Sequence, residues 1–339
     1  DAEAGLVRPQ IVSGTHAISI CLSILEPGDE LVSASGPPYD TLQTVIGTKG
    51  ASRRSLVKRG IVYKEVPLKP TGGLDLDAIR QQITGKTKMT IFQRSRGYSW
   101  RPSLTVGELA AGIRAVREAN PDCIVFVDNC YGEFVESIEP LEAGADLIAG
   151  SLIKNPGGAL AIAGGYIAGR QDLVDLCAEV LTAPSLGAKL GTSFGLARSL
   201  LQGLFIAPHI VGEAVYGAML AAEVFRTLGY EVSPLPDEPR TDIVQAIKFG
   251  SKEELLSFCR GVQKAAPVDA HFLPMPSPMP GYTDEVVMAG GTFVQGSSIE
   301  LSADGPLREP YIGYLQGGMS RQHVEITLRI VLQEMGLAN

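Results

Sequence analysis

Apolar and polar positions alternate between two periods along the first two hundred residues. Short continuous apolar runs, typical of strands buried on both faces, are separated by segments whose apolar residues recur every three or four positions, as in amphipathic helices. The predicted strands cover 30–34, 61–67, 89–93, 123–128, 161–168 and a short stretch before Lys154. The predicted helices cover 13–26, 75–83, 104–119 and 172–181. This alternation predicts an α/β fold with a mostly parallel central sheet that helices cover on both faces.

The pattern changes beyond residue 208. A long helix is predicted over 209–228, where apolar positions recur at three and four and Gly229 follows. The remaining elements are predicted as strands at 242–249, 286–289 and 298–302 and helices at 252–265 and 320–332. We therefore predict a large α/β domain over 1–208, followed by a connecting helix and a smaller C-terminal α+β domain over 209–339. The first nine residues read like the middle of a domain, so we expect an N-terminal segment to be missing from the large one.

Composition and charge narrow the classes of partner. The chain has 339 residues, of which 45% are hydrophobic and 19% charged, as in a globular protein. A net charge of −8 argues against nucleic acid or an anionic membrane as a partner. The most apolar long stretch, 199–220, is interrupted by Pro208, His209 and Glu213. Five cysteines without CxxC spacing predict free thiols in a cytoplasmic protein and no metal site.

Lys154 is the residue around which the candidate chemistry is organised. It lies in an apolar, glycine-bounded segment directly after a predicted buried strand. Burying an ammonium group is costly unless the group becomes neutral, and a neutral lysine amine is a nucleophile that forms Schiff bases with carbonyl groups or pyridoxal phosphate. The alternative is a solvated loop lysine, which is the commoner role of a lysine taken alone.

Other residues could complete a pyridoxal-phosphate site. Free N–H groups where a helix begins at Gly14 and Thr15 form an anion site, to which the Ser151 hydroxyl could add. Asp128 ends an apolar strand, where ligands of parallel sheets bind, and a carboxylate there would keep the pyridine nitrogen protonated. Tyr39 could stack on the ring and transfer a proton. Taken singly, Asp128 could instead be a turn or capping acid and Tyr39 a loop aromatic.

Several segments resemble one enzyme family. Ser13-Gly-Thr-His-Ala, Pro38-Tyr-Asp-Thr-Leu, Val127-Asp-Asn and Ser151-Leu-Ile-Lys-Asn-Pro-Gly-Gly are similar to motifs of the fold-type I pyridoxal-phosphate enzymes of the cystathionine/methionine lyase group. The methionine γ-lyase-like branch often labelled aluminium resistance protein is indicated by the segments at 93–103, 202–209, 299–306 and 311–318. The resemblance covers nearly the whole chain and implies a fold-type I transferase-like architecture.

The resemblance also implies roles for residues. Lys154 would be the Schiff-base lysine and Tyr39 the stacking tyrosine that helps in catalysis. The remaining cofactor contacts would be made by Gly14, Thr15, Asp128 and Ser151. His16 would pack beside the phosphate loop without acting as a general base.

Two departures from the better-known lyases affect the site. Ile153 stands where a threonine often precedes the lysine, which removes one phosphate hydroxyl. Glu300 precedes the Leu-Ser pair where an arginine usually binds the substrate carboxylate. We predict that Arg308 takes this role, with Arg96 as the second candidate, because a guanidinium binds a carboxylate with two hydrogen bonds. Either arginine could instead form a structural ion pair.

These features predict a pyridoxal-phosphate-dependent carbon–sulfur lyase in amino-acid metabolism. It would release a keto acid and ammonia from a sulfur-containing amino acid by β- or γ-elimination. The resemblance implies a homodimer or homotetramer with shared active sites. The alternatives are an aminotransferase that uses the same cofactor apparatus, a pyridoxal-phosphate-binding stress or metal-resistance protein without turnover, and a cofactor-free interaction protein.

Overall fold

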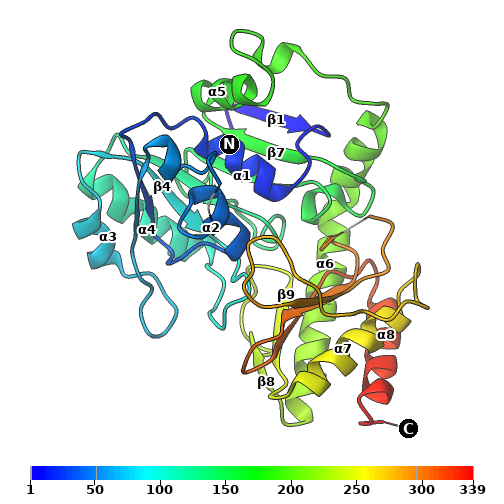
Figure 1. Cartoon of the computed structure of the whole chain (residues 1–339). Coiled ribbons are helices and arrows are strands. Elements are labelled where there is room, and N and C mark those ends of the chain that lie inside the picture. Colours follow the sequence, from blue (N-terminus) through cyan, green and yellow to red (C-terminus); the bar gives the residue numbers. More distant parts are fainter. Residues whose placement is uncertain (1, 51, 295, 339) are drawn as a thin grey trace. The chain divides into compact units, whose positions relative to one another are not determined.

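A computed structural model describes residues 2–50, 52–294 and 296–338 of the chain (Figure 1). Asp1, Ala51, Gln295 and Asn339, which the predicted domains 1–208 and 209–339 include, lie outside the described residues. The chain forms two compact units. Unit 1 comprises the residues up to Gly97, Arg101–Leu152 and Ala163–Arg198. Unit 2 comprises Tyr98–Trp100, Ile153–Ile162 and the residues from Ser199 onward. The predicted domain division at residue 209 stays a prediction.

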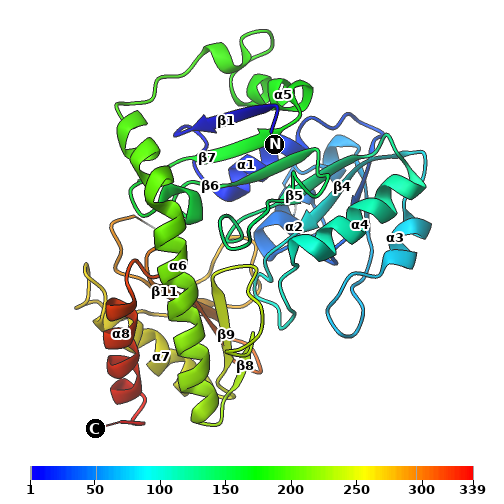
Figure 2. The same ribbon diagram turned by 180° about the vertical axis from the view of Figure 1, so that it is seen from behind.

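Unit 1 is built on a seven-stranded sheet with the strand order β1-β7-β6-β5-β4-β2-β3. Its strands are β1 (Ala4–Arg8), β2 (Glu30–Ser33), β3 (Val62–Glu65), β4 (Thr87–Gln93), β5 (Ile124–Asp128), β6 (Leu147–Ser151) and β7 (Gly165–Gly169). The five strands from β3 to β6 in this order are parallel, whereas β7 and β1 pair antiparallel. Figure 2 shows β1, β7, β6, β5 and β4 side by side in this order. The predicted mostly parallel sheet is confirmed.

Helices cover both faces of this sheet. They are α1 (Gly14–Leu22), α2 (Asp40–Ile46), α3 (Leu76–Gln82), α4 (Val106–Ala119) and α5 (Gln171–Leu181). Apolar residues of α1, α2 and α5 share one core with strand residues such as Ile91 and Phe126. On the other face α4 packs closely against β4. A Cβ atom placed on Gly112 of α4 would lie only 2.7 Å from the Phe92 ring. A capping box between Thr105 and Glu108 begins α4 and satisfies its first N–H groups.

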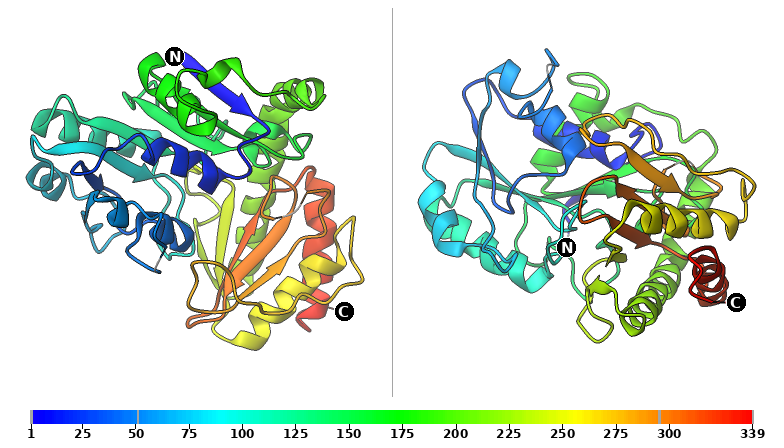
Figure 3. Two further views of the ribbon diagram at one scale, coloured as in Figure 1. Left: turned by 45° about the horizontal axis from the view of Figure 1, so that its top comes forward. Right: turned by 60° about the horizontal axis from the view of Figure 1, so that its bottom comes forward.

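Unit 2 contains a five-stranded antiparallel sheet with the order β10-β11-β12-β9-β8. Its strands are β8 (Glu231–Ser233), β9 (Val244–Lys248), β10 (Val286–Ala289), β11 (Ser302–Pro306) and β12 (Ile312–Gln316), and its helices are α6 (Ala197–Thr227), α7 (Lys252–Lys264) and α8 (Arg321–Glu334). The three helices share one core with the sheet, including the aromatic contacts of Phe225 with Phe249 and Phe258. Figure 3 shows α7 in yellow beside α8 in red. The predicted smaller α+β fold of the C-terminal part is present.

The bounds of several predicted elements differ from those in the structure, and two of these differences have a clear physical reason. The strand predicted at 298–302 begins only at Ser302 and continues to Pro306, because the backbone of Ile299 bonds to Ile153 and Gly318 instead of to a strand partner. The helix predicted over 209–228 begins at Ala197 and contains Pro208. Pro208 cannot donate a backbone bond to the preceding turn, but it lies on an exposed side, where water can satisfy the carbonyl.

Helix α6 is long and apolar enough to cross a membrane by length and composition alone. One of its faces nevertheless packs within unit 2, where Gly217 lies against Val324 of α8. The buried Glu213 on α6 forms an ion pair with Arg321. These contacts are those of a core helix in unit 2.

Candidate active site

The carboxyl ends of three parallel strands meet at one edge of the sheet in unit 1. Gln93, Asp128 and Ser151 are the last residues of β4, β5 and β6, and the ladder places Gln93 opposite Asp128. Ligands of open α/β sheets bind at this edge, where loops carry polar groups away from the packed core. Asp128 and Ser151 therefore lie where a bound ligand is expected.

Helix α1 begins against Ser151. The Ser13 hydroxyl caps the helix by accepting a hydrogen bond from the His16 amide at 3.1 Å. The next N–H groups, on Gly14 and Thr15, precede the first bond within the helix and point outward from its end. A Cβ atom on Gly14 would lie 3.0 Å from Cys130 Sγ and 3.5 Å from Ser151 Cβ. Glycine lets the start of α1 approach Ser151 without crowding Cys130, and the approach creates a cradle of N–H and hydroxyl donors that suits a phosphate.

His16 is held as a neutral acceptor beside this cradle. Its Nδ1 accepts a hydrogen bond from the Val12 amide at 3.2 Å, which requires an unprotonated nitrogen. Burial also lowers the pKa of His16. The contacts are those of a packing residue at the start of α1.

Tyr39 is fixed from two directions. Its hydroxyl lies 2.8 Å from Thr15 Oγ1, and its backbone N–H donates to Gln93 Oε1 at 2.8 Å. Gly97, at a φ of 58°, lies against it, with 3.4 Å between the Tyr39 Cβ and a Cβ placed on Gly97. The ring is thereby connected both to the start of α1 and to the end of β4.

Asp128 is buried at the end of β5. Its Oδ1 accepts a hydrogen bond from the Cys130 amide at 3.2 Å. Burial and a hydrogen bond with Cys177 raise the pKa of the Cys21 thiol on α1, and the negative charge of Asp128 adds to this effect. Asp128 follows Phe126 by two positions, so its side chain lies on the face of the sheet where Phe126 shares a core with α1.

A buried ion-pair network supports the loop after β5. The fully buried Arg94 donates to Asn129 Oδ1 at 2.7 Å and to Glu136 Oε1 at 2.9 Å. Glu133 accepts from the Tyr166 hydroxyl at 2.8 Å. Burying a charged guanidinium requires partners of this kind, so Arg94 has a structural role. The sequence showed a polar run after β4 but not which of its members was paired.

Arg96 is also buried, with 1% of its surface exposed. Its backbone N–H donates to Ser103 Oγ at 3.1 Å. The second candidate for the substrate carboxylate therefore lies inside unit 1.

Lys154 belongs to unit 2 and is half-buried. It immediately precedes a 3₁₀ turn at Asn155–Gly157. The Ile299 amide donates to the Ile153 carbonyl at 3.1 Å, which ties the loop to the segment that leads into β11. On the other side the loop packs on α6, since a Cβ on Gly203 would lie 2.2 Å from the Gly157 carbonyl oxygen. The lysine is thus carried by a loop anchored on both sides.

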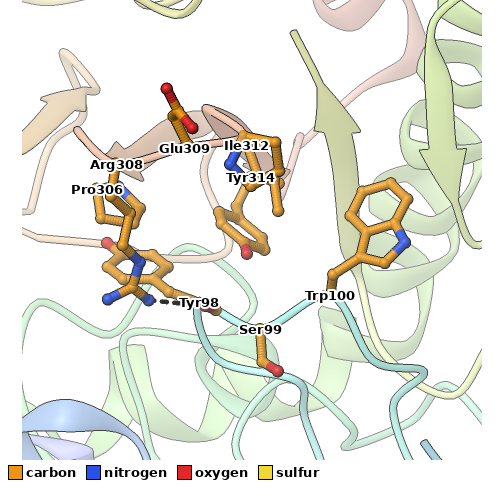
Figure 4. Close-up of a pocket in the computed structure, with 9 residues that line it drawn as sticks. Tyr98, Ser99, Trp100, Pro306, Arg308, Glu309, Ile312 and Tyr314 are labelled. Carbon is orange, nitrogen blue, oxygen red and sulfur yellow. Dashed lines mark hydrogen bonds between the residues drawn. The ribbon is translucent and has the colours of Figure 1, made fainter. Parts of the chain in front are cut away.

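Arg308, the first candidate for the substrate carboxylate, lines a pocket of ≈ 250 Å³ in unit 2. It donates to the Tyr98 carbonyl at 3.2 Å and pairs with Asp284 at 3.2 Å. Tyr98 and Tyr314 line the same pocket with ring centroids 5.2 Å apart. In Figure 4 the Arg308 guanidinium and the Tyr314 hydroxyl point toward the 98–100 segment, whereas the Glu309 carboxylate points away. The pocket offers an accessible cation beside aromatic surface.

The family model described as methionine gamma-lyase matches residues 1–336. The chain belongs to the methionine gamma-lyase family. Its members are pyridoxal-phosphate-dependent enzymes. The predicted resemblance to this family is therefore confirmed.

Individual relatives place the chain within this family. It is 49% identical over 325 residues to the uncharacterized protein YnbB of Bacillus subtilis, covering 95% of this chain and 77% of that protein. A Listeria monocytogenes protein named for a role in aluminium resistance is 50% identical, with a TM-score of 0.95 over 98% of this chain and 83% of that chain. A carbon-sulfur lyase involved in aluminium resistance from Clostridium novyi is 45% identical, with a TM-score of 0.94, and the match covers 98% of this chain and 79% of that chain. The predicted aluminium-resistance branch is confirmed.

Cystathionine gamma-lyase from Lactobacillus plantarum shares the fold at 15% identity, with a TM-score of 0.68 over 99% of this chain and 83% of that chain. The predicted fold-type I class is therefore confirmed. In this member of the methionine gamma-lyase family, unit 1 brings together Gly14, Thr15, Tyr39, Asp128 and Ser151, whereas Lys154 and Arg308 belong to unit 2. The donor set in unit 1 fits pyridoxal phosphate, because it pairs a phosphate cradle at Gly14 with a buried acid at the next strand end. Within the described residues, no three His, Cys, Asp or Glu side chains form a group that could hold a metal ion.

Sequence reasoning missed one acid in this member of the family. Asp304, in the middle of β11, has 2% of its surface exposed and accepts hydrogen bonds from Ser297 Oγ at 2.9 Å and Gln316 Nε2 at 3.1 Å. Burial raises the pKa of Asp304 to about 6, while hydrogen bonds from Ser297 and Tyr98 and the charge of Lys154 act in the opposite direction. The sequence carried little signal for this acid, because β11 reads Ser-Ala-Asp-Gly-Pro and the predicted strand at 298–302 ended before Asp304.

Proposed function

We propose that this protein is a pyridoxal-phosphate-dependent lyase that cleaves a carbon–sulfur bond in a sulfur-containing amino acid by β- or γ-elimination and releases a keto acid and ammonia. The observation that carries the proposal is the close packing of Gly14 against Ser151, which leaves a donor-lined cradle beside Asp128. Membership of a family of pyridoxal-phosphate enzymes supports it.

The residues suit separate parts of the cofactor. The N–H groups of Gly14 and Thr15 and the Ser151 hydroxyl would hold the phosphate. Asp128 would pair with the protonated pyridine nitrogen, and the Tyr39 ring would stack on the cofactor ring. When bound through Lys154, pyridoxal phosphate supplies an electron-withdrawing ring that takes up the electron pair of a bond broken at the substrate Cα.

The chain's own groups move the protons. The Lys154 amine, once released, would take the proton from the substrate Cα. The Tyr39 hydroxyl would donate a proton to the departing sulfur, and its hydrogen bond with Thr15 Oγ1 holds it in a defined direction. Arg308 would bind the substrate carboxylate, and its place in an accessible pocket favours it over the buried Arg96.

Two experiments test the proposal. The first is borohydride reduction of the cofactor-loaded chain followed by peptide mapping, which should label Lys154; label on another lysine would refute the role of Lys154. The second is a panel of cysteine, cystathionine and methionine without a keto-acid acceptor. Keto acid and ammonia should both appear, whereas turnover that requires an added keto acid would indicate an aminotransferase instead.

A second candidate is a pyridoxal-phosphate-binding stress or metal-resistance protein without turnover. Two solved relatives are named for aluminium resistance, which describes a phenotype and no reaction. A loaded protein that is inert toward the whole panel would favour this candidate.

We further propose a cytoplasmic homodimer or homotetramer with shared active sites. The support is the exposed apolar side of α6, where Leu201, Leu204 and Phe205 are 68%, 48% and 85% exposed. The five cysteines are free and buried, which suits a reducing compartment. Sedimentation of the wild-type protein and of the Phe205→Glu variant tests the assembly, because a charge on a buried interface should dissociate it.

A further inference from the structure

The carboxylate of Asp304 is a buried charged group to which the proposed reaction assigns no role. Ser297 Oγ and Gln316 Nε2 both donate to the same oxygen of this carboxylate, Oδ2. The other oxygen, Oδ1, is buried and has no hydrogen-bond partner within the described part of the chain. A carboxylate so far from water is stable in its ionised form only with further compensation. Oδ1 can therefore accept one more hydrogen bond, from a neutral donor or from a cation.

Lys154 is carried to this strand by the backbone. The Ile299 amide donates to the Ile153 carbonyl at 3.1 Å, and the Gly318 amide donates to the Ile299 carbonyl at 2.8 Å. The segment next to Lys154 is thus tied to the stretch that contains Ser297 and leads into β11. Gly157, three residues after Lys154, also packs closely against Gly203 of α6.

The charge of Lys154 acts on Asp304. Burial raises the pKa of Asp304, and the positive charge of Lys154 is among the influences that lower it again. Coupling between two charges is reciprocal, so a carboxylate that is stabilised by an ammonium stabilises that ammonium equally.

The other groups around Asp304 do not replace this cation. The Tyr98 hydroxyl and the Gln316 amide favour the ionised carboxylate as neutral donors. On α7, burial raises the pKa of the Cys259 thiol and the Asp304 charge raises it further, so Cys259 stays neutral. Lys154 is the cation among the groups that act most strongly on Asp304.

We propose that Asp304 is a positioning residue for Lys154, whose protonated amine it holds through Oδ1, and that it thereby sets the pH above which the amine is free to react. The inference deepens the proposed function and rests on it for the chemical use of Lys154. The pairing itself is a property of unit 2 and requires no cofactor. Asp304 would hold the amine ready in one direction whenever Lys154 is not bonded to its carbonyl partner.

The test measures the reactivity of Lys154 in the cofactor-free full chain. Acetic anhydride at limiting concentration labels neutral amines, and peptide mass spectrometry gives the extent at Lys154 as a function of pH. In the Asp304→Asn variant, the pH midpoint of Lys154 labelling should fall by about one unit or more, because an opposite charge at close range shifts a pKa by about 1–3 units. If the pH midpoint of Lys154 labelling is the same in Asp304→Asn as in the wild type, the proposal is overturned.

Glu300→Gln provides a matched control. Glu300 is also a buried acid, with 3% of its surface exposed. Its Oε2 accepts a hydrogen bond from the Phe293 amide, and burial is the main cause of its raised pKa. This variant should leave the Lys154 midpoint unchanged. An equal shift in Glu300→Gln would mean that Lys154 responds to general buried charge and would refute the specific pair.

A reverse measurement covers the case in which Asp304→Asn does not fold. Lys154→Met keeps the carboxylate and removes the cation, so the pKa of Asp304, followed by carbon NMR of the carboxyl group, should rise. No change would contradict the pairing.

Cofactor titration separates this inference from the proposed function. A chain that fails to bind pyridoxal phosphate but shows the Lys154 shift would refute the proposed function and retain the pair. If the cofactor binds, the pH midpoint of its visible absorbance should also differ between the wild type and Asp304→Asn.

Discussion

The Tyr39 hydroxyl lies 2.8 Å from Thr15 Oγ1, so the loop after β2 and the first turn of α1 share a hydrogen bond. The tyrosine proposed to move a proton is thereby held by a residue proposed to contact the phosphate. Binding of an anion at the start of α1 and the orientation of Tyr39 are therefore coupled.

Tyr39→Phe should lower kcat by about a hundredfold while the cofactor remains bound, because a positioned general acid typically contributes 10²–10⁴-fold. The measurement is steady-state turnover together with cofactor absorbance. Tyr63→Phe, which removes a phenol hydroxyl from β3, serves as a control and should keep full activity. Equal rates for Tyr39→Phe and the wild type would exclude proton transfer by Tyr39.

Gly14→Ala should weaken cofactor binding about tenfold or more. Its Cβ would lie 3.0 Å from Cys130 Sγ, and relief of that contact would move α1 away from Ser151. Equilibrium titration with pyridoxal phosphate measures the effect. The double variant Gly14→Ala/Cys130→Ala should recover much of the affinity, and a failure to recover would locate the loss elsewhere than in this contact.

Gly203→Ala should displace the loop that carries Lys154. The added methyl would lie 2.2 Å from the Gly157 carbonyl oxygen, and backbone cannot yield cheaply, so we expect a loss of about 1–3 kcal/mol in unfolding free energy. Chemical denaturation measures it, and borohydride trapping at Lys154 should fall in parallel. Gly212→Ala on the same helix, where a Cβ meets nothing within 4 Å, should be neutral or slightly stabilising.

Arg308→Met should raise KM for the amino acid by about tenfold or more, since hydrogen bonds to charged groups are worth about 1.5–3 kcal/mol. Arg308→Lys should recover only part of the loss because it lacks the planar fork. Asp284→Asn removes the ion-pair partner of Arg308 and should leave KM nearly unchanged. An unaltered KM in Arg308→Met would shift the assignment to Arg96.

The Glu213–Arg321 pair should make unit 2 sensitive to acid. Hydrogen bonds from the Arg321 side chain and backbone lower the pKa of Glu213 from 4.5 to about 2. A lowered carboxyl pKa contributes stability that is fully present above about pH 4.5 and is lost as the pH falls toward 2. Thermal unfolding across this range should show the wild type losing its advantage over Glu213→Gln; a constant difference would contradict the pair's contribution.

The pattern of apolar residues was sufficient to predict most of the sheet in unit 1. Strands such as β4 and β5 are buried on both faces, and the local run of apolar side chains reports that burial directly. The motifs around Gly14 and Lys154 were specific enough to identify the family. Strand β12 escaped prediction because its Gly313 and Gln316 interrupt the apolar run, and its place depends on pairing with β9 and β11.

What the amino-acid sequence determined by itself was thus the α/β class, the place of most strands and helices along unit 1 and the family, because each depends on short segments. Tertiary structure decided which polar residues face one another. Arg94 and Arg96 are only two positions apart in the sequence. The contacts of the buried Arg94 with Asn129 and Glu136 show that Arg94 forms a structural ion pair. Asp304 follows Lys154 by 150 positions, and the hydrogen bond between Ile299 and Ile153 ties the two segments together. Contacts between distant segments depend on the closure of the whole fold, which leaves no local periodic signal.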